Sequence, residues 1–114
     1  MSISKYQAAQ RNTESPRQAE RRLFGQVNGA LMRIGARLDV EATVTLEWNR
    51  RIWLTMQSDL ARDENQLPDN LRAQLISLAI WVDKHTSKVL QGQAAVVPLI
   101  EVNRSIMEGL ATAS

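Results

Sequence analysis

The sequence predicts an all-α protein: a compact bundle of four to five helices, with a central fourth helix at about residues 68–91. Apolar residues recur at spacings of three and four along most of the chain, and no segment shows the alternation typical of a strand. Proline occurs only 3 times in 114 residues. We expect a single helical domain over residues 1–114, with a weakly held N-terminal segment at residues 1–14.

The first well-marked helix begins after Ser15, a capping residue followed three positions later by Gln18. A short helix in "YQAAQR", residues 6–11, is expected before it. Gly35 is expected to end the helix that begins after Ser15, and Asp39 is expected to cap the next helix. The predicted apolar stripe consists of Ala19, Leu23, Val27, Ala30, Leu31, Ile34 and Leu38.

Three further helices follow, at about residues 40–62, 68–91 and 98–109. The polar segment "RDENQLPDN" separates the first two, and Gly92 ends the second. Within the second, "LISLAIWV" is apolar almost all round, which indicates a helix surrounded by others. Its predicted stripe consists of Leu71, Leu75, Leu78, Val82, His85 and Val89.

Two tryptophans flank a basic pair in "LEWNRRIW", residues 46–53. Because a helix advances about 100° per residue, Trp48 and Trp53 point about 140° apart and cannot share one narrow stripe. Trp53 falls within the apolar arc of its helix and is assigned to the core. Trp48 lies at the edge of that arc, where a contact position and a half-buried packing role both remain open.

Three polar residues fall inside apolar stripes: Asn49, His85 and Asn103. A buried polar group without a partner costs ~1–3 kcal/mol. We therefore expect some of the three to form hydrogen bonds between helices. The alternative, that backbone or water satisfies each one separately, stays open.

The composition offers little for catalysis. The chain has no cysteine, one histidine and no glycine-rich phosphate loop, so we expect no enzyme, no cofactor and no metal site. The N-terminus lacks a secretory signal, and no apolar run reaches the ~20 residues that span a bilayer. We expect a cytoplasmic protein without a membrane segment.

Charge is distributed unevenly along the chain. Residues 1–38 carry seven basic and two acidic side chains, residues 39–70 three and seven, and residues 71–114 four and three, for a net charge of +2. Regions of opposite sign can pair within the molecule, so the basic start is weak evidence for nucleic acid. The arginines that could contact phosphate are Arg17, Arg21, Arg22, Arg50 and Arg51.

Five segments resemble the FlaF family of flagellar biosynthesis regulators: "YQAAQ", "SPRQAERRLFGQVNGALM", "WNRRIWLTMQSDLA", "LPDNLRAQLISLAIWVDKHTSKVL" and "PLIEVNRSIMEGL". They span the chain from Tyr6 to Leu110. The resemblance implies a small cytoplasmic protein needed to make and export flagellin, often acting opposite the translational regulator FlbT. It implies no catalytic residue.

The resemblance leads us to expect a chaperone-like partner of flagellin that recognises an amphipathic helix in a groove. The expected partner-binding residues are Trp48, the Arg51 side of the same helix, and Arg104 of the last helix. Two alternatives remain: an RNA-binding regulator of flagellin message, and an adaptor that binds FlbT or a second copy of itself.

Overall fold

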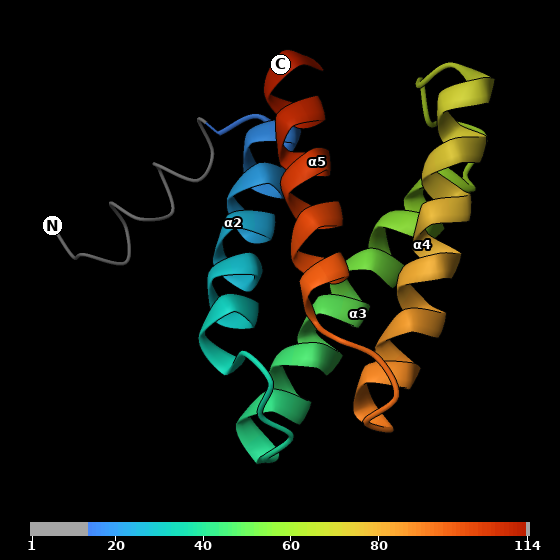
Figure 1. Cartoon of the computed structure of the whole chain (residues 1–114). Coiled ribbons are helices and arrows are strands. Elements are labelled where there is room, and N and C mark those ends of the chain that lie inside the picture. Colours follow the sequence, from blue (N-terminus) through green and yellow to red (C-terminus); the bar gives the residue numbers. More distant parts are fainter. Residues whose placement is uncertain (1–13, 114) are drawn as a thin grey trace, which may run out of the picture.

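The computed structural model describes residues 14–113, which form four α-helices and contain no strand. This confirms the all-α class. The expected short helix at residues 6–11 and nearly all of the N-terminal segment 1–14 lie outside the described residues. The helices, shown in Figure 1, are α2 (Pro16–Ile34), α3 (Val40–Leu60), α4 (Asp69–Leu90) and α5 (Val97–Ala113).

Local capping chemistry sets the helix ends near the predicted positions. The Ser15 hydroxyl accepts from the Gln18 amide at 3.1 Å, while the Ser15 amide donates to Gln18 Oε1 at 2.9 Å. The Asp39 carboxylate caps α3. Gly92, at φ 74°, follows α4, and the amide of Gln93 donates back to the Lys88 carbonyl at 2.8 Å. Glycine suits this site because it adopts the left-handed conformation without strain.

The helices pack as two main pairs, α2 with α5 and α3 with α4, and α2 also packs against α3 (Figure 1). Close backbone contact between α4 and α5 is confined to few residues. The prediction of a central fourth helix is therefore wrong, because α4 lies at the edge of the bundle.

The burial pattern of α4 follows from this position. Only the side packed on α3 is buried, through Ala79, Val82, Thr86 and Val89. The outer residues Ile80 and Trp81 remain 43% and 37% exposed. An apolar surface all round the helix therefore does not mark a surrounded helix here.

The core joins side chains from all four helices. At its centre the ring of Phe24 meets Trp53 edge-on, with centroids 5.3 Å apart, an arrangement favoured by the ring quadrupoles. Trp53 is buried, as predicted. In α2 the buried stripe includes Phe24, which was not predicted. Of the residues predicted in that stripe, Leu23 is exposed on α2, and Leu38 is exposed in the turn beyond the end of α2.

Candidate partner-binding surfaces

Three buried asparagines meet where α2, α3 and α5 converge. The Asn103 side-chain nitrogen donates to Asn49 Oδ1 at 2.8 Å and to Asn28 Oδ1 at 3.3 Å. Asn103 Oδ1 accepts from Trp53 Nε1 at 2.8 Å, and the Asn28 nitrogen donates to the Ile100 carbonyl at 3.3 Å. We call Asn28, Asn49, Asn103 and Trp53 the asparagine junction.

Interhelical hydrogen bonds were expected for some of Asn49, His85 and Asn103, and the junction shows them for Asn49 and Asn103. Asn28 was missed, although it follows Phe24 by four residues and precedes Leu31 by three, so it lies in the same stripe. Among the described residues the Asn49 side-chain nitrogen has no partner. All three asparagines are at most 3% exposed, so the junction aligns helices and does not face a ligand.

His85 has a different role from that of the asparagines. It is half-buried at the edge of α4, not central in a buried stripe as predicted, because that stripe runs through Val82 and Thr86. Its Nε2 donates to the carbonyl of Ala95 in the α4–α5 loop at 2.8 Å. Its ring stacks on Trp81 with centroids 4.7 Å apart. His85 thus connects the loop to an exposed aromatic ring.

The arginine that follows Asn49 holds α3 to α4. Arg50 donates to the Ser87 hydroxyl at 3.1 Å and pairs with Asp83 at 3.6 Å, and it also pairs with Glu47 on its own helix. Arg50 is half-buried, so its place in "WNRR" has a structural explanation.

The three predicted partner-binding residues occupy different settings. Trp48 is half-buried and packs against the core cluster, whereas Arg51 and Arg104 are exposed. Arg104 points about 200° around α5 from Val102, two residues earlier. Among the described residues, no Cα atom of α5 lies within 8 Å of one in α3, so Arg104 is not a backbone neighbour of Trp48 or Arg51. Their role in binding remains a prediction.

A cleft opens between the side chains of α4 and α5. It is open to solvent, has a volume of about 400 Å³ and is lined by Leu78, Trp81, Pro98, Glu101, Val102 and Ser105. Leu78 and Trp81 also border a shallower hollow of about 490 Å³ along α4, completed by Ala73, Gln74 and Ser77. We call these two hollows together the α4–α5 cleft. In Figure 1, α4 and α5 diverge from the loop that joins them.

Sequence reasoning missed this cleft, because Trp81 was included in a helix assumed to be covered on every side. A signal was present: Trp81 lies about 100° from Val82 on the helix, so both cannot point to the centre of one narrow interface. Lys84 and Lys88 lie within about 60° of the direction of Trp81, which indicates an exposed face.

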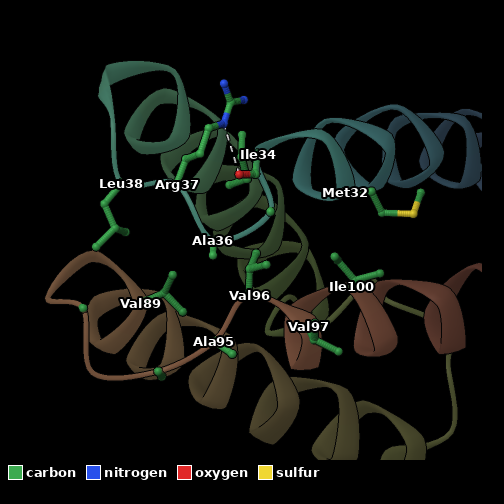
Figure 2. A pocket seen from close by; sticks show the side chains of 13 residues that line it. Met32, Ile34, Ala36, Arg37, Leu38, Val89, Ala95, Val96, Val97 and Ile100 are labelled. Atoms are coloured by element: carbon green, nitrogen blue, oxygen red, sulfur yellow. Dashed lines mark hydrogen bonds between the residues drawn. The ribbon is translucent and has the colours of Figure 1, made fainter.

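A second hollow lies at the loop end of the bundle. This loop groove has a volume of about 420 Å³ and is bounded by the end of α2, the α2–α3 turn, the α4–α5 loop and the start of α5. Figure 2 shows Leu38, Val89 and Val96 around it, with Met32 and Val97 toward α5. Arg37 folds back over the turn and donates to the Ile34 carbonyl at 3.2 Å.

Ion pairs on α2 engage part of the basic N-terminal region. Arg17 pairs with Glu20 at 3.3 Å, and Arg22 pairs with Glu14 at 3.0 Å. The hydrogen bonds that Arg22 donates to Glu14, together with the negative charge of Glu14, raise the pKa of Arg22 above its usual value. Of the arginines considered for phosphate contacts, Arg17, Arg22 and Arg50 therefore have carboxylate partners.

Two structural searches found nothing in the part of the chain that the structure describes. No group of three or more His, Cys, Asp or Glu side chains there could hold a metal ion. Among residues 14–113, no helix combines the length and the hydrophobicity needed to cross a bilayer.

Comparison with known proteins identifies one related family. The sequence model of the family described as flagellar protein FlaF matches residues 2–110 of this chain. Neither a curated protein nor a solved structure matches it significantly.

Proposed function

The chain belongs to the FlaF family of flagellar proteins, and we propose that it binds flagellin as a chaperone-like partner, controlling flagellin synthesis and export for filament assembly. The observation that carries this proposal is the uncovered apolar face of α4. Ile80 and Trp81 are 43% and 37% exposed on a helix that packs mainly against α3, and both point away from its buried residues.

The physical basis is the behaviour of flagellin before assembly. Its terminal segments are amphipathic helices that stick to one another, and an apolar groove can take up such a helix. Each Å² of apolar surface removed from water contributes about 25 cal/mol. Binding would keep the subunit soluble until export. Occupancy of the protein would also report how much flagellin is unassembled, which links export to synthesis.

The direct test is complex formation between the purified chain and monomeric flagellin, followed by size-exclusion chromatography with light scattering. We expect a one-to-one complex that also forms with an isolated terminal segment of flagellin. Absence of binding to intact flagellin and to both terminal segments would contradict the proposal.

An adaptor that binds FlbT is the second candidate, and the same exposed face of α4 supports it because any helical partner could cover that face. The same chromatography with FlbT in place of flagellin separates the two. A complex with FlbT alone would favour the adaptor.

RNA binding has less support from the charges. Arg17, Arg22 and Arg50 are paired with carboxylates, which leaves Arg21 and Arg51 of the five arginines considered. RNA binding through phosphate contacts predicts an affinity for flagellin message that falls steeply with salt. A flat salt dependence, or no binding, would remove this candidate.

A further inference from the structure

We infer that the α4–α5 cleft is the flagellin site and that it holds one amphipathic helix from a terminal segment of flagellin, with Trp81 as the central anchor. The inference rests on the proposed function and adds the location and the chemistry of the bound segment. It replaces the surface around Trp48, Arg51 and Arg104 that the sequence predicted.

The dimensions of the cleft suit a helix. The α4 residues that line the cleft run from Ala73 to Trp81, about 12 Å at 1.5 Å per residue. That length accommodates about two turns of a bound helix. Ala73 and Ser77 are small residues on this face, so they allow close approach beside Trp81.

The cleft is continuous with the hydrophobic core. Leu78, Val102 and Ile106 are half-buried and pack against the core cluster. Trp81 and Leu78 line both of the hollows that make up the cleft. A helix laid along them would complete the burial of side chains that the chain itself covers only in part. Such partly desolvated apolar positions are where binding energy concentrates.

Trp81 is held in place before any partner arrives. Its ring stacks on His85, and the His85 Nε2 is fixed by its hydrogen bond to the Ala95 carbonyl. An aromatic anchor that is already ordered loses little conformational entropy on binding. His85 is thus a positioning residue for the anchor.

The charges beside the cleft have opposite signs and define the partner further. Lys84 lies one turn beyond Trp81 on α4, and Glu101 lines the cleft from α5. Among the described residues neither makes an ion pair. The bound helix is therefore expected to carry acidic residues on the flank facing α4 and basic residues on the flank facing α5. Such complementary charges fix orientation and raise association rates.

The test measures the affinity of the full chain for intact flagellin and for each terminal segment by isothermal titration calorimetry. Trp81→Ala should weaken binding about 30-fold, the loss typical of an aromatic hot spot. Ser105→Trp keeps every existing contact but fills the cleft, and it should weaken binding to a similar extent. Circular dichroism and thermal melting establish that each variant is folded.

Matched controls address the other surfaces. Trp48→Ala tests the second partly buried tryptophan, and Leu38→Ala tests the loop groove. Both should retain flagellin affinity within about twofold. Lys84→Glu and Glu101→Lys should each weaken binding several-fold, whereas Arg104→Glu should not, because Arg104 points away from the cleft.

The outcomes separate this inference from the proposed function. If the wild-type chain binds flagellin and only the Trp48, Arg51 or Arg104 variants lose affinity, the cleft assignment is overturned and the function stands. If Trp81→Ala converts a dimer to a monomer without changing flagellin affinity, a second copy occupies the cleft and the assignment is also overturned. If the wild-type chain binds no flagellin, both the cleft assignment and the proposed function are contradicted.

Discussion

At the asparagine junction three amides lie buried and hydrogen-bonded among helices, whereas on the outer face of α4 large apolar side chains lie in contact with solvent. Asn49 and Asn103 are fully buried, and Ile80 is 43% exposed. The polar residues are inside and the apolar residues are outside, the reverse of the usual preference.

The difference between the two regions lies in where their partners come from. Buried amides are usually hydrogen-bonded, and at the junction three helices of the same chain supply at least one partner to each asparagine. The described helices cover the outer face of α4 only in part, since α5 approaches α4 at few residues. The asparagine junction fixes the helices relative to one another, whereas the outer face of α4 remains available for binding.

The largest effect is expected at the centre of the junction. Asn103→Leu removes the partner of Trp53 Nε1, of Asn49 Oδ1 and of Asn28 Oδ1. At ~1–3 kcal/mol for each unsatisfied group, the free energy of unfolding should fall by about 3 kcal/mol or more. Urea denaturation measures it, with Arg104→Ala as the exposed neighbour expected to change it by at most ~0.5 kcal/mol. A loss below ~1 kcal/mol for Asn103→Leu would refute the assigned network.

A pair of substitutions compares the two faces of α4. Val82→Ala removes a fully buried side chain and should lower the free energy of unfolding by about 2 kcal/mol. Ile80→Ala removes a larger but exposed side chain and should change it by at most ~0.5 kcal/mol. Equal losses in chemical denaturation would mean that the outer face is covered in the folded chain.

A smaller effect is expected at Asn49. Its oxygen accepts one hydrogen bond from Asn103, and its nitrogen has no partner among the described residues. In Asn49→Leu the Asn103 nitrogen keeps its bond to Asn28, so the loss should be about 1 kcal/mol. Denaturation of both variants side by side gives the ranking. Equal losses in the free energy of unfolding for Asn49→Leu and Asn103→Leu would contradict the assignment of Asn103 as the centre of the junction.

A small effect on stability is also expected for Ile80→Lys. A charge on this exposed side of α4 is solvated, so the free energy of unfolding should change by less than ~1 kcal/mol. The apolar patch is interrupted, so binding of an environment-sensitive hydrophobic dye to the folded chain should decrease. Dye fluorescence at fixed protein concentration tests this, and an unchanged signal together with a large loss of stability would contradict the comparison.

Most helix ends were predictable because capping is local chemistry, but α5 continues to Ala113, beyond the end expected near residue 109. Ser15, Asp39 and Gly92 act within a few residues of themselves, and the structure places each at the expected helix end. The burial of Trp53 was also predicted from its place in the apolar arc. The sequence placed Asn49, His85 and Asn103 alike in apolar stripes and did not show which of them is buried; Asn49 and Asn103 are buried, and His85 is half-buried.

The exposed side of α4 was not predictable for a physical reason. Periodicity identifies a buried face only when the opposite face is polar, and "LISLAIWV" offers no such contrast. Which apolar residues are covered then depends on how many helices reach α4, a property of tertiary packing. Because α4 was expected to be covered on every side, His85 was placed in a buried stripe. Neither the exposure of Trp81 nor the cleft was predicted.

Hydrogen exchange of the full chain, with and without a terminal segment of flagellin, tests the central claim most directly. The account predicts slower amide exchange in residues 71–84 of α4 and 98–105 of α5, with the middle of α2 unchanged. Protection centred on Trp48 and Arg51 with none in α4, or no protection anywhere at saturating flagellin, would contradict it.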